Sequence, residues 1–309
     1  MAFTAKDVQA LREKTGVGMM DCKKALVESD GDMDKAIDFL REKGLAAATK
    51  KAGRIAAEGV VLAYNDEDKK IGVLVEVNSE TDFVAKNEEF QKFVLDVAKT
   101  IVENNPADVE ALLEQNLFGT DRKVLENLQD KILSIGENIK VRRFERVEGA
   151  VASYIHGGGT VGVMVRFDTD DKTANAEEFK AMGRDIAMQI AAMNPQFLDA
   201  TSVPQETIQH EKDILLAQIQ EDEKMKSKPE KVLEGIVSGK VAKFCKEVCL
   251  MEQEFVKSTD HSSVAKYVKD TAAQLGSEIK VIGFTRFAKG EGLEKREDNF
   301  ADEVASMMK

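Results

Sequence analysis

The 309-residue sequence has no tryptophan, 4 prolines, 3 cysteines and 3 histidines. So few prolines exclude collagen-like and proline-rich chains. An odd number of cysteines without paired spacing is typical of reduced thiols, so we expect a cytoplasmic protein. The histidines stand in no metal-ligand spacing, and Cys245 and Cys249 have no third ligand nearby in the sequence. We therefore expect no metal and no cofactor.

Long apolar runs are also missing. No stretch approaches the roughly 18 uninterrupted apolar residues of a transmembrane helix, and the first residues contain no apolar core of signal-peptide length. The 44 basic residues are outnumbered by 56 acidic ones, and the resulting net charge of −12 repels phosphate backbones. These features predict a soluble protein with no membrane partner and no direct nucleic-acid partner.

The residues that are present suffice for several packed cores. Hydrophobic residues make up 43% of the chain and charged residues 32%, which excludes a wholly disordered protein. The length predicts two or three domains.

Residues 1–45 predict three short helices, packed as a bundle similar to ubiquitin-associated domains. A Gly-rich turn separates the first helix from the second, which begins at Met19 or Asp21. The third helix is expected to end at Gly44. Residues 46–57 would then form a helical linker. This module is small and can bury little surface.

Met19 and Met20 lie beside the Gly-rich turn of this module, where both side chains cannot point inward. One interpretation is that one methionine is core and the other is exposed by chance. The alternative is an adaptable apolar docking patch, because methionine packs against partners of varied shape. The sequence leaves both interpretations open.

An internal repeat divides the rest of the chain into a first copy at 58–147 and a second at 148–289. Glu58–Tyr64 is echoed by Glu148–Tyr154 at an offset of 90 (148 minus 58). In each copy two β-rich runs form a hairpin, helices follow, and a strand closes the unit. The predicted fold class is α+β, with two related subdomains that each have a three-stranded antiparallel sheet and helices on one face.

The second copy carries an insertion. The offset between matching residues grows from 89 at the first helix to 140 at the last strand, which means 51 extra residues (140 minus 89). Residues 204–248 fit this insertion as a protruding helical hairpin, or arm, suited to contact a partner or a second copy of the chain. The apolar stripe predicted on its first helix consists of Ile208, Ile214, Leu215 and Ile219. Residues 290–309 would form a C-terminal helical module.

Signatures of catalytic sites are not found in the sequence. No Gly-x-Ser-x-Gly elbow occurs, and Ser238–Lys240 lacks the other residues of a phosphate-binding loop. Gly157–Gly159 lies between two strands of a hairpin, so a turn is the favoured interpretation. A cytosolic enzyme with an unrecognised site is one hypothesis. The lack of clustered His and Cys counts against it, so we expect that the protein is not an enzyme.

One loop of the first copy is unusual. The strand predicted at Ile71–Val77 is followed by a polar connection in which Phe83 stands beside Asp82. The corresponding stretch of the second copy, 168–176, contains no aromatic residue. Two interpretations are open. The ring either tucks back onto the core or forms an exposed wedge, with Asp82 as its charged neighbour.

Two long stretches resemble the elongation factor Ts family: Leu11–Leu26 (LREKTGVGMMDCKKAL) and Glu76–Lys86 (EVNSETDFVAK). Ile135–Ile139 (IGENI), Ser153–Gly157 (SYIHG) and Gly290–Lys295 (GEGLEK) are also similar to that family. The resemblance implies a guanine-nucleotide exchange factor for elongation factor Tu that accelerates GDP release during translation elongation. The family's fold has a three-helix domain, two related core subdomains, a helical hairpin and a C-terminal module, which agrees with the predicted one.

The resemblance also implies which residues meet the partner. Asp82 and Phe83 would press between helices of the partner's GTPase domain and displace its Mg²⁺, while Thr81 and Val84 would set the shape of the loop. Further contacts to the GTPase domain are implied for Leu11, Met19, Met20, Lys23, Ile135, Gly136 and His156. A C-terminal helix at about 299–308 would dock there as well.

A competing hypothesis is a non-catalytic cytosolic adaptor or holdase that uses the helical module and the arm. Such a protein would bind a partner without accelerating any reaction. A homodimer or a heterotetramer, formed through the core or the arm, is also compatible with the sequence.

Overall fold

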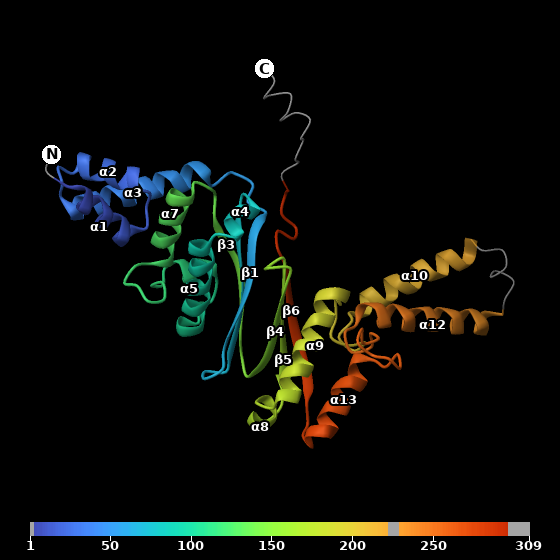
Figure 1. The fold of residues 1–309 in the computed structure, drawn as a ribbon. Coiled ribbons are helices and arrows are strands. Elements are labelled where there is room, and N and C mark those ends of the chain that lie inside the picture. The colour runs from blue at the N-terminus through green and yellow to red at the C-terminus, as the bar shows by residue number, and fades with distance from the viewer. Residues whose placement is uncertain (1–2, 222–228, 296–309) are drawn as a thin grey trace.

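The computed structural model describes residues 3–221 and 229–295. Two three-stranded antiparallel sheets form its centre and pack against each other, with helices on their outer faces (Figure 1). The strands of the first sheet are β1 Glu58–Asp66, β2 Ile71–Ser79 and β3 Lys140–Glu148, and those of the second are β4 Ala150–His156, β5 Val161–Asp168 and β6 Lys280–Ala288. Each closing strand pairs with the second strand of its hairpin, and the predicted α+β fold class is confirmed.

The helices follow the same order in both copies. In the first copy they are α4 Asp82–Ala85, α5 Glu88–Asn104, α6 Val109–Leu113 and α7 Val124–Ile135. In the second copy they are α8 Asp171–Ala174, α9 Glu177–Met193 and α13 Val264–Leu275. A short helix therefore follows the hairpin in each copy, and a long helix then covers the outer face of the sheet (Figure 1).

The central strands lie between two apolar layers. Because strand side chains alternate, Val73 and Val75 of β2 face the helices of the first copy, while Leu74 faces the other sheet and shares a cluster with Met164 of β5. A Cβ atom at Gly162 would lie 2.5 Å from Val61 and 2.8 Å from Leu74. Glycine at this position therefore permits the close approach of the two sheets.

The N-terminal module consists of α1 Ala5–Thr15, α2 Met19–Glu28 and α3 Met33–Lys51. The predicted end of the third helix at Gly44 is wrong, because α3 continues to Lys51. Gly44 is buried, and a Cβ atom there would lie 3.5 Å from the backbone of Gln129 in α7. This is an ordinary van der Waals distance, and the packing of α3 against α7 joins the module to the first copy (Figure 1).

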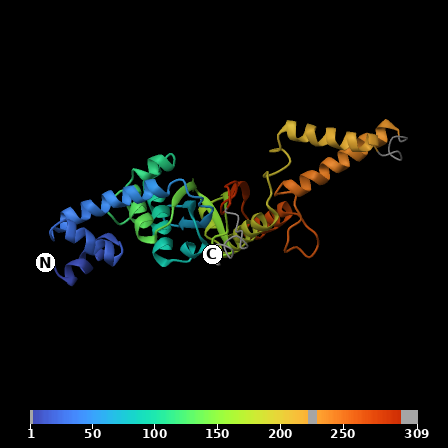
Figure 2. The same ribbon diagram turned by 90° about the horizontal axis from the view of Figure 1, so that it is seen from above.

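The arm consists of α10 Gln205–Glu221 and α12 Glu230–Val248 and projects from the second copy, at the opposite end of the molecule from the N-terminal module (Figure 2). Leu215 and Ile219 are buried against Val237, as the predicted stripe requires. Ile214 is exposed, contrary to prediction, because it precedes Leu215 and so lies about 100° away around the helix. Within the described residues, no helix combines the length and apolarity needed to span a bilayer. The helix predicted at 299–308 lies outside the described residues.

Candidate partner-binding site

Phe83 stands on the short helix α4 at one end of the two sheets, with 78% of its surface exposed. The next residue, Val84, is buried and belongs to the core of the first copy. Since adjacent residues of a helix point in different directions, burial of Val84 turns the ring of Phe83 outward. The interpretation in which the ring tucks back onto the core is therefore wrong.

Hydrogen bonds on the C-terminal side of α4 hold this short helix against α5. The side chain of Asn87 accepts a hydrogen bond from the amide of Phe90 at 3.1 Å and so caps α5. The amide group of Gln91 donates to the carbonyl of Ala85 at 3.0 Å. The segment that carries Phe83 is therefore fastened to a long, well-packed helix.

Opposite charges flank the exposed ring. Lys86 Nζ lies 2.9 Å from Asp82 Oδ2 and 5.8 Å from the centroid of the Phe83 ring. The hydrogen bond from Lys86, together with the charges of Lys86 and Lys289, holds the pKa of Asp82 below its usual range. Asp82 is therefore an anion at neutral pH. An exposed aromatic ring is typical of protein interfaces, which are enriched in aromatic residues.

Ile135 and Gly136 lie close to this loop. Gly136 ends α7 in the left-handed conformation with φ +86° and is exposed, whereas Ile135 is half-buried against the core of the first copy. The residue that follows, Glu137, contacts the backbone just before α4. The structure therefore brings two of the predicted partner-binding residues beside Phe83.

His156 comes from the second copy but lies at the same end of the sheets. It is exposed at the start of the β4–β5 turn, where all three glycines of 157–159 have positive φ, so the predicted turn is confirmed. The carbonyl of Gly159 accepts a hydrogen bond from the amide of Val61 near the start of β1, at 2.9 Å. This contact holds the turn of His156 against the first copy.

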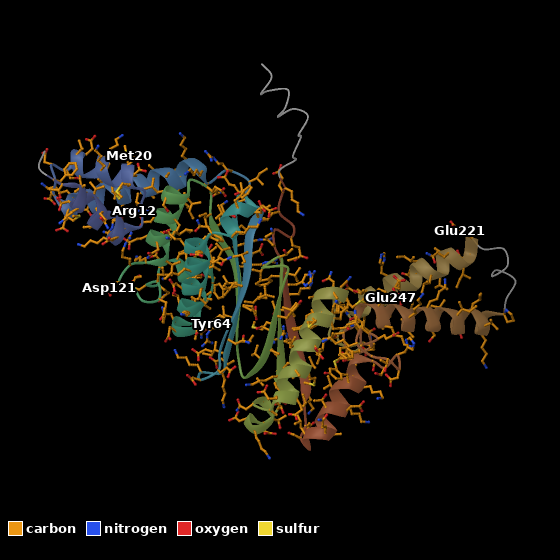
Figure 3. All side chains as sticks on the ribbon, viewed as in Figure 1. Arg12, Met20, Tyr64, Asp121, Glu221 and Glu247 are labelled. Atoms are coloured by element: carbon orange, nitrogen blue, oxygen red, sulfur yellow. The ribbon has the colours of Figure 1, made fainter. Side chains whose placement is uncertain are left out.

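The N-terminal module presents an apolar surface. Met19 is 43% exposed and Met20 is 73% exposed, so the interpretation in which one of them is core is wrong. Lys23 is exposed one turn further along α2, and Figure 3 shows Met20 on the module, far from Glu221 at the outer end of α10. Leu11 is fully buried inside the module, so its side chain supports α1 and is not on the surface.

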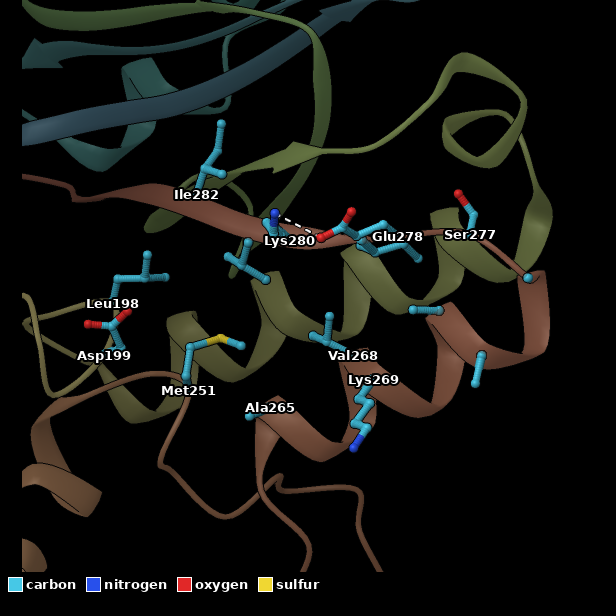
Figure 4. A pocket seen from close by; sticks show the side chains of 15 residues that line it. Leu198, Asp199, Met251, Ala265, Val268, Lys269, Ser277, Glu278, Lys280 and Ile282 are labelled. Atoms are coloured by element: carbon cyan, nitrogen blue, oxygen red, sulfur yellow. Dashed lines mark ion pairs between the residues drawn. The ribbon is translucent and has the colours of Figure 1, made fainter.

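Metal-ligating groups, cysteines and pockets are the other features that bear on function. No group of three or more His, Cys, Asp or Glu side chains suited to a metal ion occurs in the part of the chain that the structure describes. Burial raises the pKa of Cys249 to about 12, so its thiol stays protonated. An open groove of about 890 Å³ lies between α13 and β6 on the outer side of the second copy (Figure 4). Its lining is largely apolar, with one ion pair of 2.8 Å between Lys280 and Glu278.

Sequence analysis did not predict the roles of two carboxylates: that of Glu137 accepts from the backbone just before α4, and that of Glu80 accepts from the amide of Asn138 after α7. Both belong to stretches that resemble the elongation factor Ts family, EVNSETDFVAK and IGENI, so the resemblance was the available signal. Their pairing is invisible in local patterns because 57 residues separate them.

Comparison with known proteins gives one consistent result. A family model described as Elongation factor TS matches residues 80–291. Elongation factor Ts of Clostridium perfringens strain ATCC 13124 is 50% identical over 308 residues, which cover 99% of this chain and 99% of that protein. The protein of the same name from Syntrophotalea carbinolica is 49% identical over 312 residues and covers 100% of both chains. That from Clostridium novyi strain NT is 48% identical over 309 residues, covering 99% and 98%.

Proposed function

This chain belongs to the elongation factor Ts family of translation elongation factors, and we propose that it is a guanine-nucleotide exchange factor for elongation factor Tu. It binds the GDP form of that GTPase and accelerates release of GDP. The observation that carries this proposal is the ring of Phe83, which is exposed on α4 and flanked by the Asp82–Lys86 ion pair.

The proposed mechanism is insertion of the Asp82–Phe83 pair between helices of the GTPase domain. A Mg²⁺ ion bound to GDP is the largest local charge in such a site and neutralises the diphosphate. Displacement of this ion by the ring of Phe83 and the carboxylate of Asp82 would lower the affinity of the GTPase for GDP. No covalent bond forms or breaks, so the protein acts through binding alone and not as an enzyme in the chemical sense.

Magnitudes show that Phe83 cannot act alone. A GTPase that holds GDP with nanomolar affinity binds it by about 12 kcal/mol, and a 10⁵-fold faster release requires about 7 kcal/mol. Burial of one phenylalanine supplies only about 2–3 kcal/mol. The remainder has to come from a wide interface of more than roughly 1,000 Å². Gly136 and His156 are exposed at the same end of the sheets as α4, and Met19 and Met20 are exposed on the N-terminal module.

Thermodynamic linkage sets a further requirement. If this protein weakens GDP binding by a given factor, GDP weakens the binding of this protein by the same factor. The nucleotide-free GTPase is therefore the form that it binds most tightly.

Stopped-flow release of a fluorescent GDP from elongation factor Tu tests the proposal. The parent protein is expected to accelerate release at substoichiometric amounts, and Phe83→Ala to slow the accelerated release by about 30- to 100-fold, the equivalent of one buried ring. Phe118→Ala is the matched control. Phe118 is also exposed in the first copy, but its amide bonds Thr100 near the far end of α5.

The outcomes separate the hypotheses. An adaptor or holdase would bind elongation factor Tu without accelerating GDP release. If Phe83→Ala releases GDP as fast as the parent, the ring is not the wedge.

A further inference from the structure

The carboxylate of Glu137 accepts three hydrogen bonds from the two residues that precede α4. Its Oε2 atom accepts from the amides of Glu80 and Thr81, each at 3.0 Å, and its Oε1 atom accepts from the Thr81 hydroxyl at 2.6 Å. Thr81 is the N-cap residue of α4, yet its side chain makes no capping bond to that helix. The hydroxyl that would ordinarily cap α4 is thus used to bind Glu137.

The contact is reciprocal. Glu80 Oε1 accepts a hydrogen bond from the amide of Asn138 at 2.6 Å, so each of the two loops presents a carboxylate to the backbone of the other. Arg54 lies just past the end of α3 and contacts both residues. Its Nη1 atom donates to Glu80 Oε1 at 3.4 Å, and its backbone carbonyl accepts a hydrogen bond from Asn138 Nδ2 at 2.7 Å. Asn138 is buried, and hydrogen bonds to charged groups in such surroundings are the stronger kind.

The second copy provides an internal comparison. Thr81 corresponds to Asp170, because each is the N-cap of the short helix after its hairpin. Glu137 corresponds to Ser277, at the offset of 140 that relates the closing strands (277 minus 137). There the Ser277 hydroxyl donates to Asp170, whose carboxylate also caps α8 through the amide of Thr173 at 2.9 Å.

One hydroxyl–carboxylate bond between these two loops is therefore common to both copies. The positions of Glu80 and Asn138 are also linked in both copies, since the Thr169 hydroxyl donates to the carbonyl of Glu278 at 2.8 Å. The first copy adds the bonds of Glu137 to two backbone amides. Phe83 corresponds to Lys172, since both are second in their short helices. The additional bonds thus occur in the copy that carries an exposed ring.

We infer that Glu137 is a positioning residue for nucleotide exchange, which acts by holding the Phe83 loop against the force that the partner exerts on the ring. A helix of 4 residues has little rigidity of its own, and its C-terminal side is held by Asn87 and Gln91. Glu137 holds the opposite side. The inference rests on the proposed exchange function and adds to it the residue that keeps the wedge in place.

Rates of GDP release at saturating exchange factor test this role. Glu137→Ala is expected to lower the saturating rate by about 10- to 100-fold, the effect of misplacing an acting group by about 1 Å. The concentration that gives half-maximal acceleration is expected to change less than about threefold, because the other contacts to the partner persist. Thr81→Val should lower the saturating rate and Thr81→Ser should restore it, since serine keeps the hydroxyl. Glu178→Ala, at an exposed position of α9 in the second copy, is the control.

A double-mutant cycle separates positioning from general structural support. If Glu137 acts through Phe83, Glu137→Ala combined with Phe83→Ala is no slower than Phe83→Ala alone. Two outcomes would overturn the inference and leave the proposed function intact. One is that the losses of rate in the two single variants add up in the double variant. The other is that Glu137→Ala releases GDP as fast as the parent while Phe83→Ala is slow. If Phe83→Ala itself is as fast as the parent, the wedge role fails first. Should Glu137→Ala not fold, the Thr81 pair of variants decides by itself, and equal rates for valine and serine overturn the inference.

Discussion

The carboxylate of Glu76 accepts a hydrogen bond from the backbone amide of Gly290 at 2.8 Å, across 214 positions of the sequence. Glu76 is fully buried in β2, and the same carboxylate accepts from Asn78 at 3.0 Å, Arg142 at 3.0 Å and Arg143 at 2.6 Å. The chain that leaves β6 of the second copy is thereby fastened to the first sheet. This connection joins the copies separately from the apolar layer between their sheets.

Glu76→Ala is expected to lower the free energy of unfolding by about 3 kcal/mol. The substitution leaves two guanidinium groups and a backbone amide without their common acceptor, and removing one partner of a buried ion pair costs about 3–5 kcal/mol. We expect a loss at the lower end of this energy range because the side chains of Arg142 and Arg143 are 22% and 30% exposed, so water can partly replace the lost carboxylate. Urea unfolding measures the loss, with the exposed Glu178→Ala as control. A loss below about 1 kcal/mol would contradict the assigned role.

The same carboxylate predicts a dependence of stability on pH. Burial acts to raise the pKa of Glu76, but hydrogen bonds from Gly290, Asn78, Arg143 and Arg142 outweigh it and hold the pKa below the ordinary value of 4.5. A pKa that is lower in the folded state stabilises the protein above the unfolded-state pKa. That stability is lost as the pH falls through the folded-state value.

Thermal unfolding between about pH 6 and about pH 3 checks this expectation. The parent should lose more stability over this range than Glu76→Gln, which has no carboxylate to protonate. Equal losses in the two proteins would show that another group is responsible.

Two neighbouring glycines allow backbone strain to be separated from steric clash. Gly290 has φ +67°, and a Cβ atom there would lie 2.2 Å from the carbonyl oxygen of Ala57. Gly292 has φ +73°, but its nearest neighbour would be Arg142 Nη2 at 4.0 Å. Gly292→Ala is therefore expected to cost only the left-handed conformation, about 1–2 kcal/mol. Gly290→Ala should cost more, and calorimetric melting of both variants tests the difference. Equal melting temperatures would rule out the clash.

Gly44 predicts opposite effects for small and large side chains. A Cβ atom at this position would make an ordinary contact of 3.5 Å with the backbone of Gln129. Gly44→Ala is expected to stabilise the protein by up to about 1 kcal/mol, because alanine has the higher helix propensity. Gly44→Phe is expected to push α3 away from α7. Faster amide hydrogen exchange in α3 of the phenylalanine variant alone would bear this out, and a destabilised alanine variant would argue against it.

The sequence was sufficient where the signal is local. The two hairpins, the long helices and the arm follow from alternating or helical spacing of apolar residues, which reports burial within a few positions. The duplication followed from matched stretches such as Glu58–Tyr64 and Glu148–Tyr154. Phe90, Phe93 and Val94 of α5 are all in the core of the first copy, as their spacing predicted.

Local sequence patterns gave a wrong prediction where a residue far along the chain decides the packing. Glycine near the end of a helical pattern ordinarily marks a helix end, so the pattern placed the end of α3 at Gly44. The structure shows that α3 continues past Gly44, which is buried against the backbone of Gln129, far along the chain. For Leu11 the family resemblance implied a partner contact, and the structure places its side chain in the core of the module.

From its residues alone, the chain could be recognised as two related α+β units with a helical module, an arm and one aromatic residue in a polar loop. The direction of that ring depended on contacts that form only after folding. Val84 is buried in the core, and Glu137 bonds the residues before α4. Such contacts join segments far apart in the sequence, and the free energy that they contribute depends on distance in space. Periodicity and composition do not report distances in space. The exposure of Phe83 and the hydrogen bond between Gly290 and Glu76 could therefore be seen only in the tertiary structure.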